Sequence, residues 1–143
     1  MSRRTLPSGY RAVYRGKRYR SDSGDGSSVT LWDEETGANE VATVPIEDLD
    51  EWYRIRTVGT YVGEPFKVNA EMDDGTYWIS FDGGNGRKIA DEWEARKDAA
   101  DGSRHWQEDR YTFMATVPKA EVHDVREDRF DLLGPWRAAK EQR

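Results

Sequence analysis

The tetrapeptide Ala-Thr-Val-Pro occurs twice in this chain, at residues 42–45 and again at 115–118. Upstream of each copy lies an aromatic residue with a glycine turn, at Gly16 and at Gly63, and then an Asp-Gly step. Downstream of each copy comes an acidic segment punctuated by apolar residues. The matching surroundings predict one structural unit that is used twice.

Alternating residues predict that this unit is built from short strands. Near the start of the chain, Tyr10, Ala12 and Tyr14 fall on one face, and Arg11 and Val13 fall on the other. A period of two is typical of a strand with one face toward a core. The proline that closes each tetrapeptide ends its strand, because proline cannot donate to a ladder. A single helical turn and a further strand are expected after it.

The second copy is longer than the first because of an insertion at residues 83–110. Within it, Ile89 and Trp93 are about one helical turn apart, and Gly102 stands where a helix C-cap belongs. We expect a helix at residues 89–100. The last residues, 130–143, are expected to form a short docked helix or tail.

The order of these elements resembles that of an SH3-like barrel. In that family a strand ends in a Val-Pro step before a 3₁₀ turn, as Val44-Pro45 and Val117-Pro118 do here. The resemblance implies two SH3-like barrels in tandem that pack together, at residues 1–56 and 57–129. It implies architecture only, because the turns at Gly16 and Gly63 are too short to be the ligand loop of peptide-binding SH3 domains.

Composition limits the classes of function. The 143 residues contain no cysteine and carry a net charge of −6, which excludes a disulfide scaffold and disfavours a general nucleic-acid binder. No long apolar run or signal-like segment is present, so we expect a soluble, cytoplasmic protein. Residues 1–20 carry seven basic side chains and no acid, whereas residues 21–51 carry ten acids and no base. This separation of charge along the chain suits a partner with a basic surface, unless the two segments lie side by side and neutralise each other's charge.

Little in the sequence indicates catalysis. His105 and His123 are the histidines, and their spacing does not match a metal site. The glycine-rich residues 83–86 lack the Walker pattern of a phosphate-binding loop. We therefore expect no enzyme activity, no cofactor and no metal.

The insertion is the first candidate binding surface, since it combines acids with two tryptophans. One tryptophan should pack the insertion onto the barrel, and the other could be exposed among acids, as in a protein inhibitor that plugs a cationic cleft. In size and acidity the chain is similar to bacterial immunity proteins, which neutralise toxins by blocking their active clefts. The predicted contact patch for a toxin partner is Asp91, Glu92, Trp93, Glu94, Trp106, Glu108 and Asp109. The alternative is that both tryptophans are core and the acids are merely solvated.

The second candidate surface is the basic opening hairpin. Arginines interleaved with tyrosines favour a nucleic-acid-binding SH3-like reader, with charge for phosphates and rings for stacking. The candidate residues are Arg11, Arg15, Lys17, Arg18 and Arg20. Against this, the same alternation sends the tyrosines into the core. A third possibility is a scaffold subunit that forms an apolar homodimer.

Overall fold

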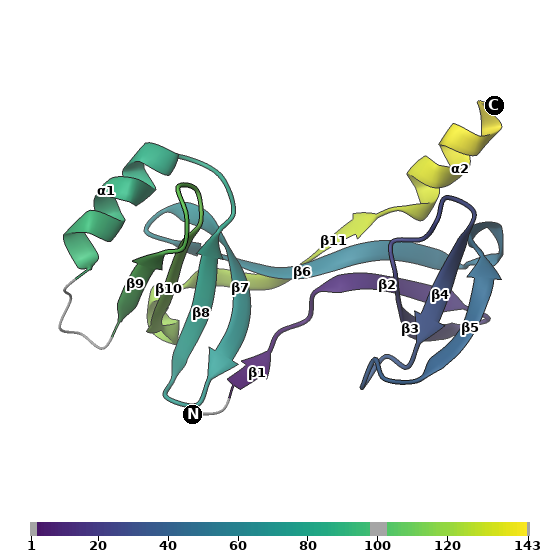
Figure 1. Cartoon of the computed structure of the whole chain (residues 1–143), viewed down its shortest axis with the longest axis horizontal. Helices are drawn as coiled ribbons and strands as arrows, with labels where there is room; N and C mark the ends of the chain where they lie inside the picture. Colours follow the sequence, from purple (N-terminus) through teal and green to yellow (C-terminus); the bar gives the residue numbers. More distant parts are fainter. Residues whose placement is uncertain (1–2, 98–102, 143) are drawn as a thin grey trace. The chain divides into compact units, whose positions relative to one another are not determined.

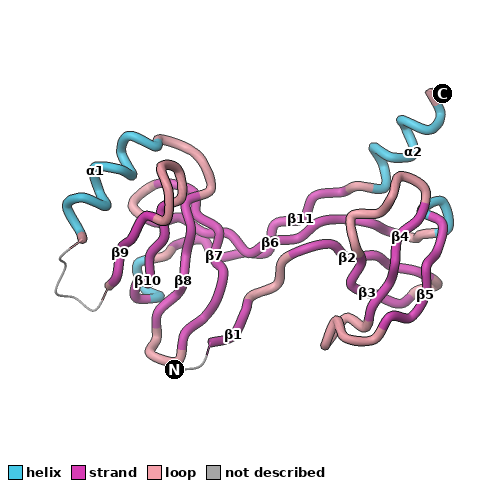
Figure 2. Tube along the Cα trace, viewed as in Figure 1, coloured by secondary structure: helices cyan, strands magenta, loops and turns pink. Residues whose placement is uncertain are grey.

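The computed structural model describes residues 3–97 and 103–142, and within them the protein is mainly β (Figure 1, Figure 2). The strands are β1 (Arg3–Thr5), β2 (Gly9–Tyr14), β3 (Lys17–Ser21), β4 (Ser28–Trp32), β5 (Glu40–Pro45), β6 (Glu51–Tyr61), β7 (Glu64–Met72), β8 (Thr76–Phe81), β9 (Arg104–Gln107), β10 (Phe113–Pro118) and β11 (His123–Asp131). The helices are α1 (Gly86–Arg96) and α2 (Leu133–Glu141), and 3₁₀ turns lie at Ile46–Asp48 and Lys119–Glu121. Among the described residues, neither helix has the length and apolarity needed to cross a membrane.

The chain divides into two compact units. Unit A comprises Ser8–Ile55 with the described part of Arg129–Arg143, and unit B comprises the described parts of Met1–Pro7 and Arg56–Asp128. The sequence instead predicted consecutive blocks at 1–56, 57–129 and 130–143. The difference lies at the chain ends, because β1 pairs with β7 of unit B and Leu133 of α2 packs into the core of unit A.

In unit A the strand order is β5-β4-β3-β2-β6, and each neighbouring pair is antiparallel. The turn between β2 and β3 consists of Arg15 and Gly16, whose φ angles are 51° and 78°. Two positive φ angles indicate a type I′ turn, whose twist matches that of the flanking strands. The core is formed around Ala12, Leu31 and Ile46, each fully buried.

In unit B the strand order is β6-β7-β8-β10-β9, again antiparallel. The turn between β6 and β7 has the same geometry as its counterpart, with φ 49° at Val62 and 76° at Gly63. Phe66, Ile79 and Ile89 are fully buried and form the centre of the core. Ile89 comes from α1, so the predicted insertion is part of this core.

The predicted repeat is present in the strand order and in the register. The first tetrapeptide lies on β5, which pairs with β4, and the second lies on β10, which pairs with β8. The residue after each proline makes the same bond: the Ile46 amide donates to Ser27 O at 2.9 Å, and the Lys119 amide donates to Gly75 O at 3.1 Å. In each repeat the last strand pairs with the first, β6 with β2 and β11 with β6. The strands form an open antiparallel sheet.

Some element boundaries differ from those predicted. The helix begins at Gly86 instead of Ile89, because the Asn85 side chain caps it by accepting from the Lys88 amide at 3.1 Å. The predicted end of this helix and its C-cap at Gly102 lie outside the described residues. The last strand was expected near residues 122–125, but β11 extends to Asp131. Both single helical turns after the prolines are confirmed as 3₁₀ turns.

Candidate functional site

The tryptophan of α1 is a core residue. Trp93 is only 5% exposed, and its indole lies parallel to the Phe66 ring with 5.7 Å between centroids. Its Nε1 donates to the carbonyl oxygens of Met114 at 2.9 Å and Trp106 at 3.1 Å, so α1 is fastened to β9 and β10 (Figure 1). The prediction that Trp93 contacts a partner was therefore wrong, because its ring is already enclosed.

The acids of α1 differ in how accessible their side chains are to a binding partner. Asp91 and Glu94 are exposed, whereas Glu92 is partly buried. Glu92 pairs with Arg96 one turn later at 2.8 Å, and Glu94 pairs with Lys97 at 2.8 Å. Exposed pairs of this kind contribute little stability, about 0.3–0.5 kcal/mol each. Asp91 and Glu94 can therefore bind a partner at a low cost in free energy, even where Glu94 gives up its pair with Lys97.

The turn between β9 and β10 presents an exposed aromatic ring beside acids. Tyr111 is 75% exposed, while Trp106 on β9 is half-buried. Asp109 accepts hydrogen bonds from the backbone amides of Tyr111 at 2.8 Å and Thr112 at 2.9 Å. The bond from the Tyr111 amide is the largest cause that lowers the pKa of Asp109. Glu108 in the same turn is exposed. The sequence indicated that one of the two tryptophans could be the exposed ring, and it did not point to Tyr111.

The basic hairpin does not present its arginines on one exposed face. In the register, Arg20 of β3, Arg11 of β2 and Tyr53 of β6 are directly opposite one another across three strands. Arg11 is only 7% exposed, so its prediction as an outward-facing residue was wrong. Burial lowers the pKa of Arg11, and the nearby Arg20 and Arg18 lower it further. Arg15 and Lys17 are exposed at the hairpin turn.

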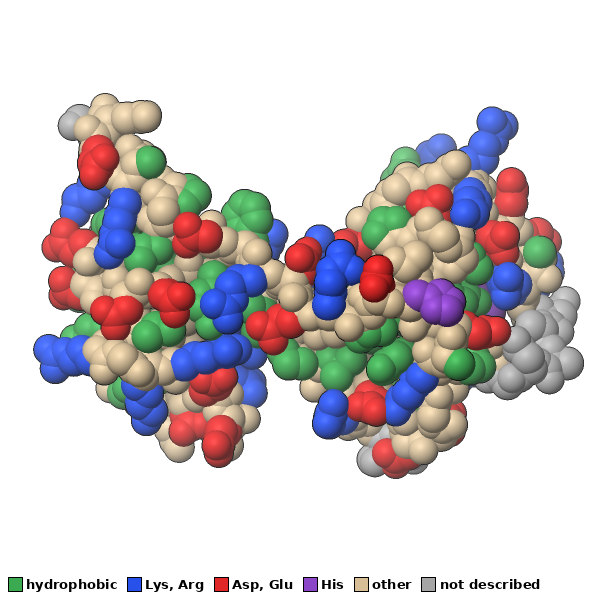
Figure 3. Space-filling view, turned by 180° about the vertical axis from the view of Figure 1, so that it is seen from behind, with side chains coloured by type: hydrophobic (Ala, Val, Ile, Leu, Met, Phe, Trp, Pro, Cys, Tyr) green, Lys and Arg blue, Asp and Glu red, His purple; other side chains and the backbone are tan. Residues whose placement is uncertain are grey.

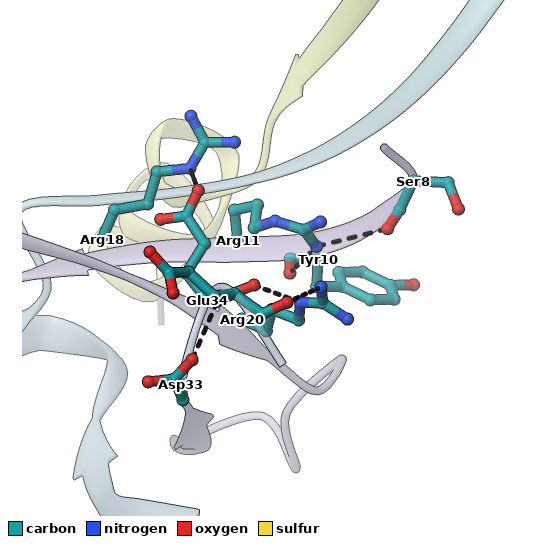
Figure 4. Close-up of polar contacts among 8 residues, drawn as sticks. Ser8, Tyr10, Arg11, Arg18, Arg20, Asp33 and Glu34 are labelled. Carbon is teal, nitrogen blue, oxygen red and sulfur yellow. Dashed lines mark hydrogen bonds and ion pairs between the residues drawn. The ribbon is translucent and has the colours of Figure 1, made fainter. Parts of the chain in front are cut away.

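Acidic residues compensate this basic strand (Figure 4). Arg18 Nε lies 2.8 Å from Glu34 Oε1. Arg20 donates through Nε to Glu34 O at 2.6 Å and through Nη2 to Glu35 O at 3.0 Å. The acidic and basic segments therefore lie side by side, as one of the sequence alternatives predicted. Over the face seen in Figure 3, acidic and basic side chains are likewise interspersed.

Unit A also contains a cavity of about 480 Å³ beside α2 that the sequence did not indicate. Trp136 of α2 forms one wall and donates through Nε1 to Gly26 O at 2.8 Å. At its rim, Lys140 pairs with Glu47 at 2.6 Å. The remaining lining residues are Ser27, Ser28, Pro45 and Ala139.

The histidines play different structural parts. His105 on β9 lies with Nε2 2.8 Å from the Tyr61 hydroxyl and is partly buried, whereas His123 is exposed. Within residues 3–97 and 103–142, no group of three or more His, Cys, Asp or Glu side chains is placed to hold a metal ion.

Comparisons of the chain with protein-family models, with curated proteins and with solved structures found no match.

Proposed function

We propose that the protein is a non-catalytic binding module, and that it neutralises a bacterial toxin by occluding a cationic active cleft. The proposed partner is a toxin domain with a basic surface, bound by a monomer or small oligomer of this chain. The observation that carries the proposal is Tyr111, a 75% exposed ring next to the preorganised carboxylate of Asp109. An exposed tyrosine supplies apolar contact area at low entropic cost. The neighbouring acids steer the encounter with a basic partner and discriminate against partners without a basic surface.

The rigid support beneath this surface favours the same function. The two hydrogen bonds of Trp93 link α1, β9 and β10, so the exposed carboxylates of Asp91 and Glu94 project from an element that is already fixed. Preorganisation lowers the ordering cost of binding. The proposed contact set is Tyr111 with Asp91, Glu94, Trp106, Glu108 and Asp109.

The proposed architecture is a tandem of two SH3-like units. It is supported by the equal strand order of the two repeats and by the 3₁₀ turn that follows Pro45 and Pro118 in each. The matching amide bonds of Ile46 and Lys119 support it further. Under this proposal, unit B is the elaborated copy, because only its repeat contains α1 and β9.

The test is to co-express the chain with the product of the neighbouring gene and to measure complex formation and growth rescue. Tyr111→Ala should abolish rescue and weaken the affinity at least about tenfold, as expected for a binding hot spot. Phe130→Ala is the matched control, since Phe130 is also exposed, at 58%, but belongs to unit A. Equal affinities of the wild type and Tyr111→Ala for the partner would contradict the proposed binding surface.

A further inference from the structure

We propose that Arg11, Arg18 and Arg20 form a binding site for a phosphate group, and that the Glu34 side chain occupies this site in the free protein. The site lies in unit A, on the β2 and β3 hairpin beneath the turn that follows β4 (Figure 4). It is separate from the protein-binding surface proposed above, and its test is independent of that partner.

One buried guanidinium nitrogen in this cluster, Arg11 Nε, makes no hydrogen bond among the described residues, and a second, Arg18 Nε, is paired with the Glu34 carboxylate. Arg11 donates through Nη1 to Ser8 O at 3.2 Å and to Tyr10 O at 3.0 Å, but its Nε makes no hydrogen bond. Arg18 Nε is close to Glu34 Oε1, yet the contact is an ion pair without a directed hydrogen bond. A buried donor without an acceptor costs about 1–3 kcal/mol. Arg11 Nε can therefore donate to another oxygen ligand, and Arg18 Nε can do so when Glu34 moves away.

The charges in the cluster are also unbalanced. Arg11 and Arg20 are directly opposite each other on neighbouring strands, an arrangement in which like charges destabilise the sheet. Of the groups that shift the Arg11 pKa, the cations Arg20 and Arg18 lower it and Glu34 is the carboxylate that raises it. The three guanidinium groups and the Glu34 carboxylate together carry an excess of two positive charges.

A phosphate group fits this excess better than a carboxylate does. A phosphate monoester carries close to two negative charges at neutral pH and has three strong acceptor oxygens. The planar guanidinium fork binds such oxygens in pairs. One phosphate in place of the Glu34 carboxylate would lower the excess from two positive charges to about one and give the Nε atoms of Arg11 and Arg18 acceptors.

Glu34 can leave without releasing its turn. Its side chain is 36% exposed, and Arg20 holds the main chain of the same turn through Glu34 O and Glu35 O. Asp33 caps the turn by accepting from the Glu35 amide at 2.9 Å and the Thr36 amide at 3.1 Å. The backbone contacts therefore persist when the carboxylate moves away.

The experiment titrates inorganic phosphate into the full chain at low ionic strength, with calorimetry for affinity and arginine Nε–Hε NMR signals for location. Glu34→Gln should bind phosphate about tenfold more tightly than the wild type, because a competing charged acceptor is removed. Glu35→Gln is the matched control, since it removes one acid from the same turn and should leave the affinity unchanged. Adding Arg18→Gln to Glu34→Gln should abolish the gain.

Three outcomes would overturn the proposal. The first is no phosphate binding by either the wild type or Glu34→Gln. The second is an equal gain for Glu34→Gln and Glu35→Gln, which would indicate a nonspecific charge effect. The third is an oligothymidylate without a terminal phosphate that binds Glu34→Gln more tightly than phosphate does, which would indicate an extended nucleic-acid surface in place of a phosphate pocket.

Discussion

The indole Nε1 of Trp93 donates to the carbonyl oxygen of Met114 at 2.9 Å, so a side chain of α1 is hydrogen-bonded to the main chain of β10 in unit B. The same nitrogen also reaches Trp106 O at 3.1 Å. One residue thereby fixes the helix, the edge strand β9 and its neighbour β10 together.

Replacing this residue should separate its polar and apolar contributions. Trp93→Phe keeps most of the apolar contact but removes the donor, and it should lower the free energy of unfolding by about 1–3 kcal/mol. Trp93→Ala also leaves a cavity and should cost about 3–5 kcal/mol. Urea unfolding followed by circular dichroism measures both. An unchanged free energy of unfolding in Trp93→Phe would show that the hydrogen bonds contribute nothing, and equal losses for the two variants would show that the apolar contact adds nothing.

Charge reversal on α1 should distinguish binding acids from structural ones. Asp91→Lys with Glu94→Lys should weaken partner binding and change the free energy of unfolding by less than about 1 kcal/mol, because both side chains are exposed. Glu92→Lys should lower the melting temperature more, since Glu92 pairs with Arg96, which lies 5.8 Å from the centroid of the buried Tyr61 ring. Thermal melts and titration with the co-expressed partner compare the variants. The idea fails if the double variant binds as the wild type does.

The hairpin turn of unit A contains removable strain. Arg15 has a φ of 51°, a conformation that costs a non-glycine residue roughly 1–2 kcal/mol and that asparagine tolerates better. Arg15→Asn creates an Asn-Gly pair with Gly16 and should raise the free energy of unfolding by about 0.5–1 kcal/mol. Gly16→Ala, at φ 78°, is the opposing control and should destabilise. Denaturant midpoints of the two variants should therefore move in opposite directions.

The turn before β4 should make stability depend on acid. Hydrogen bonds from the Ser27 and Ser28 amides and hydroxyls lower the pKa of Asp25 from 3.8 to about 2. A carboxyl with a lowered folded pKa stabilises the fold above its unfolded pKa, and this contribution is lost as pH falls from about 4 toward 2. Asp25→Ala should therefore be less stable than the wild type at pH 6, with a smaller difference at pH 2. NMR titration of the Asp25 carboxyl gives the pKa directly, and a value near 4 would contradict this assignment.

Local sequence patterns were sufficient to predict the repeat and its turns. The prolines at 45 and 118 end strands and precede 3₁₀ turns, as predicted, because the ring removes the donor that a ladder needs. The glycines at 16 and 63 likewise lie in tight turns, where their positive φ is allowed. These features depend on a few neighbouring residues, so they can be inferred without knowledge of the tertiary structure.

The candidate sites were harder to predict, because exposure is decided by residues distant in sequence. The alternation correctly predicted that Ala12 is a core residue, but it did not reveal that Arg11 is buried or that the turn around Glu34 contacts the arginine cluster. For a similar reason, Trp93 of the predicted contact patch is buried, whereas Tyr111, which the sequence did not point to, is exposed. The acceptors for the Trp93 indole lie on β9 and β10, and no periodic pattern within α1 points to them.

The double use of β6 has a consequence for how such a chain can be shortened or lengthened. Its residues Glu51–Ile55 pair with β2 and its residues Val58–Tyr61 pair with β7, so one uninterrupted strand closes the first repeat and opens the second. Cutting the chain within β6 would therefore remove a strand from both repeats. Adding a further repeat would need one strand fewer than a separate copy needs, because neighbouring repeats share a strand. The segment that would have to be inserted to add one repeat therefore begins within a shared strand such as β6 and ends within the next equivalent strand.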